Sequence, residues 1–125
     1  MKRTVRSTNA PAPIGPYSQG ATATGPLLFV AGQTPKDPRS GEIPQDFRAQ
    51  VQRCMENLKA IVEAAGATLN DVVKVNAYLA DIGQFAVFNE VYARFFSEPF
   101  PARTTIGANL PGISIEVDAV AALPS

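Results

Sequence analysis

Two stretches of the chain place apolar residues every three or four positions, which is the spacing of a helix with one buried face. The first covers residues 46–65, with Asp46 as a candidate N-cap and Gly66 just beyond its end. The second covers residues 81–97, where Asp81 precedes a glutamine by three residues, as in a capping box. We expect these helices to bury two stripes, Phe47, Val51, Cys54, Met55, Leu58, Ile61, Val62 and Ala65, and Phe85, Phe88, Val91, Tyr92, Phe95 and Phe96.

Other segments have the length and the alternation of β-strands. The short apolar run 27–31 predicts a buried strand between two turns. Apolar and polar side chains alternate in 72–80, 103–110 and 113–121, which predicts strands with one apolar face. Segment 17–24 is a candidate for an additional N-terminal strand.

These elements predict a single α+β domain over residues 1–125. One or two strands come first, followed by helix, strand, helix, strand and strand, so two helices cover one face of one mixed sheet. The other face is expected to carry Lys74, Asn76, Tyr78, Arg103, Thr105, Glu116 and Asp118. This face is either exposed to solvent, as in many antiparallel sheets, or it meets another subunit.

Arg103 and Glu116 are the most suggestive pair on that face. A hairpin turn predicted at Pro111-Gly112 would place them on the same side of adjacent or near-adjacent strands. An arginine fork matches a carboxylate, and a glutamate can orient or deprotonate water. The pair therefore indicates either a site for a small acid or a simple ion pair between the two side chains.

The composition excludes several kinds of chemistry. The 125 residues include no histidine and one cysteine, so histidine-based catalysis, histidine zinc sites and a four-cysteine zinc site are excluded. Cys54 lies on a helical stripe and is expected in the core. Eleven basic residues balance eleven acidic ones, which argues against nucleic acid as a partner. No signal peptide or membrane-spanning run is evident, so we expect a cytoplasmic protein.

Several segments resemble the Rid family, the reactive intermediate deaminases of the YjgF type, which are also labelled endoribonuclease L-PSP. The resemblance lies in 12–20 (APIGPYSQG), 29–33 (FVAGQ), 101–105 (PARTT) and 115–121 (IEVDAVA), with weaker agreement in 62–66 and 71–74. It implies a chorismate-mutase-like fold and a homotrimer whose sheets form a central barrel. The functional clefts would lie between subunits.

The resemblance also implies an activity, the hydrolysis of 2-iminobutanoate, 2-iminopropanoate and similar enamines or imines to 2-oxo acids and ammonia. By position, Arg103 would bind the substrate carboxylate and Glu116 would hold or activate water. Tyr17 would close the cleft, Gly32 would allow close backbone approach, and Asn89 would lie near the cleft mouth. No cofactor or metal is implied.

Two departures from the family pattern bear on this expectation. Thr105 stands where many members have cysteine, so only a hydroxyl and backbone groups are available there. The stretch 106–115 is shorter than in the best-known deaminases. A non-catalytic regulatory trimer that binds a small carboxylate is therefore an alternative, and an endoribonuclease is a less favoured one.

Overall fold

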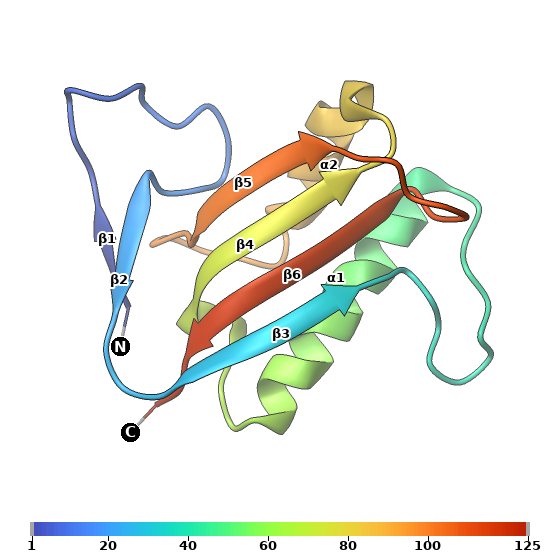
Figure 1. The fold of residues 1–125 in the computed structure, drawn as a ribbon, viewed down its shortest axis with the longest axis horizontal. Helices are drawn as coiled ribbons and strands as arrows, with labels where there is room; N and C mark the ends of the chain where they lie inside the picture. Colours follow the sequence, from blue (N-terminus) through green and yellow to red (C-terminus); the bar gives the residue numbers. More distant parts are fainter. Residues whose placement is uncertain (1, 125) are drawn as a thin grey trace.

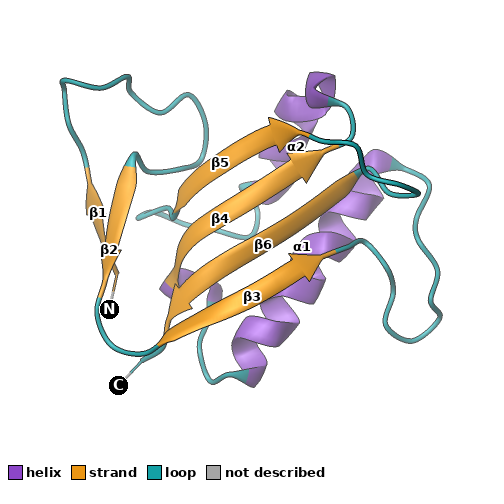
Figure 2. Ribbon diagram, viewed as in Figure 1, coloured by secondary structure: helices purple, strands orange, loops and turns teal. Residues whose placement is uncertain are grey.

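A four-stranded sheet forms the body of the protein, and both helices pack against the same face of it (Figures 1 and 2). The computed structural model describes residues 2–124. This arrangement confirms the predicted α+β class with two helices and a mixed sheet. The elements in chain order are β1 (Lys2–Val5), β2 (Gly20–Ala23), β3 (Leu27–Gln33), α1 (Phe47–Ala64), the 3-10 turn η1 (Leu69–Asp71), β4 (Val72–Leu79), the 3-10 turn η2 (Ile82–Gln84), α2 (Phe85–Tyr92), β5 (Ala102–Gly107) and β6 (Ile115–Ala122).

The strands of the main sheet lie in the order β3-β6-β4-β5. β4 and β5 run parallel, whereas β6 is antiparallel to both β3 and β4. The predicted hairpin at Pro111-Gly112 is therefore wrong, because β4 lies between β5 and β6. The connecting loop crosses the end of β4, where Ala108 N donates to Leu79 O (2.9 Å) and Ala80 N donates to Ser114 O (3.0 Å).

The N-terminal arm, residues 2–23, forms a small sheet of its own from β1 and β2. β2 lies within the candidate segment 17–24, but its partner is β1, which the apolar pattern did not reveal. Ser18 ties the arm to the chain just before β5, since its N–H donates to Pro101 O (3.1 Å) and its hydroxyl donates to Phe100 O (2.6 Å). The arm is thereby held beside the N-terminal end of β5.

Helix α1 begins and ends where the sequence predicts. The carboxylate of Asp46 accepts a hydrogen bond from Ala49 N (3.0 Å), and Gly66 follows the helix with a φ of +84°. Cys54 is fully buried on the inner stripe, and its thiol donates to Gln33 O (3.1 Å). This confirms its place in the core.

Helix α2 is shorter than predicted. Asp81 caps the 3-10 turn η2 by accepting from Gly83 N (2.8 Å), and the α-helix ends at Tyr92 instead of reaching Ser97. After Tyr92 the backbone tightens into i→i−3 hydrogen bonds, and Pro99 disfavours helical backbone in the residue before it. The apolar pattern continued beyond the helix because Phe96 is buried in the turn that follows.

Strand alternation decides which side chains the helices cover. Val75, Ala77 and Val117 are completely buried beneath the helices. The prediction of a buried strand at 27–31 holds only for Val30, because β3 is an edge strand and Phe29 points to the uncovered face with 73% of its surface exposed.

The uncovered face carries a network of polar side chains. Asn76 and Tyr78 both donate to the carboxylate of Asp118, each at 2.9 Å, and Lys74 Nζ donates to Thr104 Oγ1 (2.8 Å). The hydrogen bond to Asp118 raises the pKa of Tyr78, with smaller contributions from desolvation and from nearby carboxylate charge. Asn76, Tyr78 and Asp118 thus form a hydrogen-bonded cluster across β4 and β6 on this side of the sheet.

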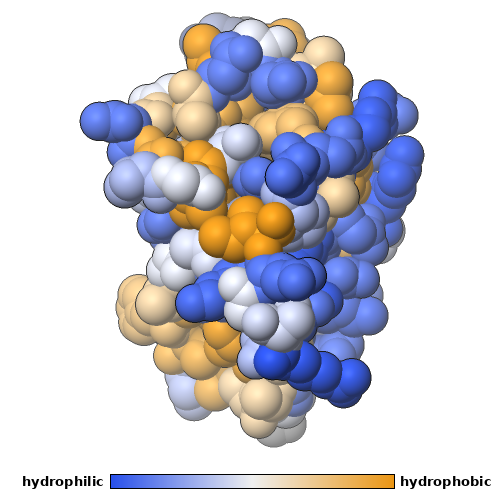
Figure 3. All heavy atoms as spheres, turned by 90° about the vertical axis from the view of Figure 1, so that its right-hand side faces the viewer, coloured by the Kyte–Doolittle hydropathy of each residue, from blue (hydrophilic) through white to orange (hydrophobic). Residues whose placement is uncertain are grey.

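The molecular surface is mixed in character. On the side that carries the loop 34–46 and the loop between β5 and β6, apolar patches alternate with polar ones (Figure 3). Within residues 2–124, neither helix has the length and apolar character needed to cross a bilayer.

Candidate functional site

Arg103 lies on the helix side of the sheet, contrary to the prediction. The parallel register pairs Arg103 with Val75 and Thr105 with Ala77, and both partners point toward the helices. Thr104 instead bonds to Lys74 on the uncovered face. The sequence prediction was wrong because strand alternation sets two faces without saying which is inner, and the charge of Arg103 suggested the outer one.

Four aromatic rings surround the Arg103 guanidinium. Its central carbon lies 4.8 Å from the ring centroid of Tyr92, 5.1 Å from those of Phe88 and Tyr17, and 5.6 Å from that of Phe85. Only 9% of the residue is exposed. The electron-rich ring faces replace part of the hydration that the buried cation loses.

Arg103 remains a cation without a carboxylate partner among residues 2–124. Burial lowers the pKa of Arg103, while Tyr92 and Tyr17 raise it in part. An arginine stays protonated at any working pH. The alternative of an ion pair between Arg103 and Glu116 is therefore excluded within one chain.

Several buried polar atoms around Arg103 have no hydrogen-bond partner within the described chain. They are Arg103 Nη1, Asn89 Oδ1, Tyr92 Oη and Thr105 Oγ1. Burial raises the pKa of Tyr92, so its phenol stays protonated and remains a donor. Each buried polar group without a partner lowers the free energy of unfolding, and a cluster of such groups is typical of a binding site.

Asn89 and Arg103 both lie close against Gly15. A Cβ atom built on Gly15 would lie 3.1 Å from Asn89 Nδ2 and 3.4 Å from Arg103 Nη2. Tyr17 belongs to the same turn, where its hydroxyl accepts from Ile14 N (3.3 Å). The structure therefore brings together three of the predicted site residues, with Thr105 on the same face of β5.

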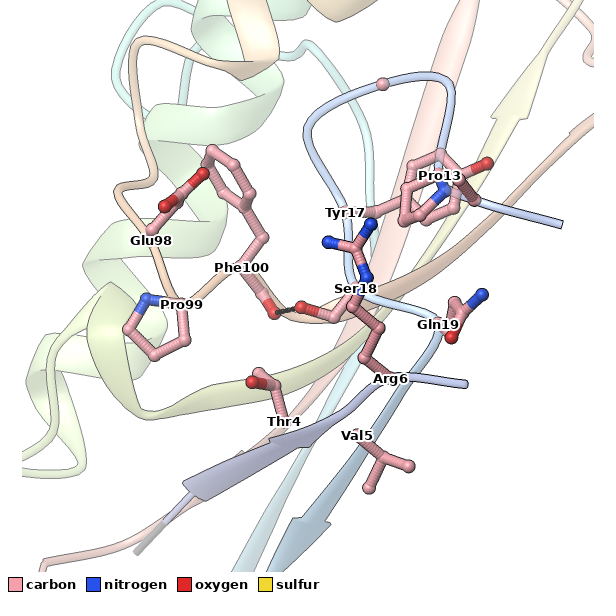
Figure 4. Close-up of a pocket in the computed structure, with 12 residues that line it drawn as sticks. Thr4, Val5, Arg6, Pro13, Tyr17, Ser18, Gln19, Glu98, Pro99 and Phe100 are labelled. Carbon is pink, nitrogen blue, oxygen red and sulfur yellow. Dashed lines mark hydrogen bonds between the residues drawn. The ribbon is translucent and has the colours of Figure 1, made fainter. Parts of the chain in front are cut away.

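A cavity of about 620 Å³ borders this turn. It is bounded by β1, the arm and the segment Glu98–Phe100, and the Arg6 guanidinium extends between the walls formed by Phe100 and Tyr17 (Figure 4). Gly15 and Tyr17 also line it, whereas Arg103 does not.

Gly32 and Glu116 form a second group, on the uncovered face. Glu116 pairs with Tyr78 in the β4–β6 register and lies two residues from Asp118, so it points away from the helices. A Cβ atom at Gly32 would overlap Glu116 Oε2 and lie 3.0 Å from its carboxyl carbon. The prediction that Arg103 and Glu116 share a face is therefore wrong.

Sequence reasoning missed part of the Arg103 site. Phe85, Phe88 and Tyr92 were predicted as core residues of a helical stripe, and together with Tyr17 they also form the aromatic cage around Arg103. The register of β5 against β4 would have revealed this, because it pairs Arg103 with the buried Val75 and so turns it toward that stripe. Gly15 was noted only as part of a motif. No cluster that could hold a metal ion occurs between residues 2 and 124.

Comparison with known proteins places this chain in a family. The model of the family described as Endoribonuclease L-PSP matches residues 7–123. A RutC family protein of Pyrococcus horikoshii is 51% identical, over 97% of this chain and 98% of its own. The 2-iminobutanoate/2-iminopropanoate deaminase of Escherichia coli is 43% identical, over 97% and 98% of the two chains.

A solved structure agrees with these relatives. The structure of Escherichia coli TdcF with bound serine superimposes with a TM-score of 0.75 at 38% identity, covering 98% of this chain and 99% of that chain. Fold and site thus define an α+β protein with a buried arginine in an aromatic cage. The chain belongs to the endoribonuclease L-PSP family, the YjgF/Rid family.

Proposed function

We propose that this protein hydrolyses reactive 2-imino and enamine acids, such as 2-iminobutanoate and 2-iminopropanoate, to 2-oxo acids and ammonia in the cytoplasm. The observation that carries the proposal is the buried Arg103 cation, which has an unpaired Nη1 and no carboxylate partner among the described residues. A ligand carboxylate would satisfy both its charge and its hydrogen bond. The identity with a named deaminase supports the reaction, and the relative with bound serine supports a small carboxylate ligand.

We propose further that the working site lies between two subunits of a homotrimer whose sheets form a central barrel. Arg103 and Glu116 point to opposite faces of one sheet, so a single chain cannot direct both at one small substrate. Glu116 of a second copy would complete the cleft. The exposed apolar side chains of Phe29 and Ile106 on the uncovered face favour such an association.

In the proposed hydrolysis each site residue has a separate role. Arg103 holds the carboxylate, Tyr17 closes the cleft, and Glu116 accepts a proton from the water that attacks the imine carbon. The new C–O bond gives a tetrahedral adduct, and Glu116 passes the proton it accepted to the nitrogen. The C–N bond then breaks to release ammonia, which takes up the hydroxyl proton as the carbonyl forms. A protonated imine is already a strong electrophile, so positioning is the main requirement.

The other predicted residues have supporting roles. Gly32 leaves room for Glu116, since a side chain there would displace its carboxylate. Thr105 offers its buried hydroxyl in place of a thiol, and Asn89 contacts the ligand beside Arg103. No cofactor takes part in the proposed reaction.

The proposal is tested by generating imines with a threonine dehydratase and following the release of 2-oxo acid. The protein should accelerate this release, and Arg103→Ala should abolish the acceleration. Arg39→Ala, in an exposed loop, is the matched control and should keep full activity. Unchanged activity of Arg103→Ala would refute the role of the cage.

A non-catalytic regulatory protein that binds a small carboxylate is the second candidate. It is favoured by the location of Arg103, Asn89 and Tyr17 in one chain, apart from Glu116. In that case 2-oxobutanoate would raise the melting temperature and no imine would be turned over. The balanced charge gives no support to RNA cleavage, despite the description of the family.

A further inference from the structure

The buried side-chain oxygen of Asn89 has no hydrogen-bond partner among the described residues, so a ligand group that contacts it should be a hydrogen-bond donor. We propose that Asn89 Oδ1 accepts a hydrogen bond from the group on C2 of the bound acid, so that the site prefers ligands with an N–H or O–H donor there over 2-oxo acids. This inference rests on the proposed function, because it assumes that the ligand carboxylate is bound at Arg103. It makes Asn89 the residue that distinguishes substrate from product.

The unpaired atoms of the site differ in what they can bind. Arg103 Nη1 is only a donor and suits a carboxylate oxygen, whereas Asn89 Oδ1 is only an acceptor. A carboxylate oxygen or a ketone oxygen cannot satisfy Asn89 Oδ1. The complementary ligand therefore carries an anionic acceptor and a hydrogen-bond donor close together.

The two side chains are close enough to bind one small molecule. Asn89 Nδ2 and Arg103 Nη2 both lie against Gly15, at 3.1 and 3.4 Å from the position that a Cβ atom would take there, so the amide and the guanidinium are neighbours. In a 2-imino acid, the nitrogen and the carboxylate are attached to adjacent carbons. Such a ligand can reach from the guanidinium to the amide.

Helix α2 fixes Asn89 in this position. Its backbone carbonyl accepts from Ala93 N (3.0 Å), and its helical neighbours Phe88 and Tyr92 are fully buried. The amide is therefore presented by packed helical backbone, with its oxygen shielded from solvent. When the bound ligand has no donor, Asn89 Oδ1 stays buried without a hydrogen bond, which weakens binding of that ligand.

Hydrolysis removes the donor that Asn89 binds. The imine or iminium carries an N–H on the group at C2, whereas the product carries a carbonyl oxygen in its place. After ammonia departs, lone pairs on the product face Asn89 Oδ1. The product is therefore held less tightly than the substrate, which favours its release.

The test compares two stable acids of nearly equal size, 2-hydroxybutanoate and 2-oxobutanoate. Only the first has a donor on C2, and we measure the affinity for both of its enantiomers. The wild-type protein should bind the better enantiomer about tenfold more tightly than the oxo acid, which is the scale of one unmade buried hydrogen bond. In Asn89→Leu this preference should fall to within about twofold, mainly through weaker binding of the hydroxy acid.

Matched variants separate this role from folding and from the proposed function. Asn109→Leu, in the exposed loop after β5, should keep the full preference. Asn89→Ala removes the same oxygen without adding bulk and should behave like Asn89→Leu. An unchanged preference in both Asn89 variants would overturn the inference, and so would equal binding of the two acids by the wild type.

Arg103→Ala distinguishes the two possible failures. If it abolishes binding of both acids while Asn89 has no effect on their ratio, the carboxylate site stands and the inference about Asn89 is refuted. If Arg103→Ala binds both acids like the wild type, the site assumed by the proposed function is itself refuted.

Discussion

At the scale of single residues, Arg103 and Glu116 carry the two charges of the proposed site, and strand alternation turns them to opposite faces of the sheet. Arg103 and Glu116 were identified from residue type and from motif resemblance, and both lie where polar groups concentrate. Their faces could not be predicted, because alternation within β5 is compatible with either side facing the helices. The four rings around Arg103 explain how a charge can occupy the inner side.

Gly32 provides a prediction at this scale. In Gly32→Ala the new methyl group would overlap Glu116 Oε2, so the carboxylate must rotate away. Because Glu116 is flexible, folding should be little affected, whereas imine hydrolysis should fall by about 10- to 100-fold through misplacement of the catalytic group. The measurement is steady-state hydrolysis together with binding of 2-oxobutanoate, which should change less than about twofold because Arg103 is untouched.

Gly107→Ala is the matched control for this substitution. A Cβ atom at Gly107 would lie 3.6 Å from Ile82 Cβ, which is an ordinary contact, so activity should be retained. Equal loss of activity in both variants would contradict the specific role of Gly32.

At the scale of elements, the sequence predicted the helices better than the strands. Helix α1 carries its own boundary signals, since Asp46 caps its start and Gly66 follows its end. The boundary of α2 was missed because Phe95 and Phe96 extend the apolar pattern past Tyr92. The crossing of β4 by the loop before β6 depends on long-range pairing, which no local signal encodes.

The packing of α1 on the sheet gives a prediction for stability at high pH. Burial raises the pKa of the Cys54 thiol from 9.0 to about 12 in the folded protein. The unfolded chain loses this proton near its ordinary pKa, so the stabilising contribution is complete below about pH 9 and declines as pH rises toward about 12. The free energy of unfolding should then fall by about 1.4 kcal/mol per pH unit from this group alone.

Cys54→Ala isolates that contribution, because tyrosines and lysines titrate in both proteins. Urea unfolding at about pH 8 and at about pH 10.5 should show that the wild type loses more stability than the variant. Parallel losses in the two proteins would mean that the thiol titrates normally, and that α1 does not exclude water from Cys54.

At the scale of the whole molecule, the separation of Arg103 from Glu116 is the main structural result. Residues far apart in the sequence, in the arm, α2 and β5, converge around Arg103, while Gly32 and Glu116 converge on the opposite side of the sheet. The motif resemblance identified Tyr17, Arg103, Gly32 and Glu116 but not the rings contributed by α2, and the predicted strands placed Arg103 and Glu116 on one face although they lie on opposite faces of the sheet.

Mixed oligomers test whether two chains complete one site. If the proposed trimer forms, Arg103→Ala and Glu116→Gln should each be inactive alone, since each would lack one half of every cleft. When the two variants are unfolded together and refolded, some clefts will combine the intact Arg103 of one subunit with the intact Glu116 of its neighbour. Random assembly of equal amounts into cyclic trimers should restore about one quarter of the wild-type activity.

The two substitutions change the net charge in opposite directions, so ion-exchange chromatography can separate the mixed oligomers and confirm that subunits have exchanged. Activity should appear only in fractions that contain both variants, because only these have a neighbouring pair of intact halves. If the mixed fractions are as inactive as the parents, Arg103 and Glu116 do not act across an interface. Restored activity would instead explain how a protein without histidine assembles its catalyst, since the cation that binds the acid and the carboxylate that activates water would meet only when the chains associate.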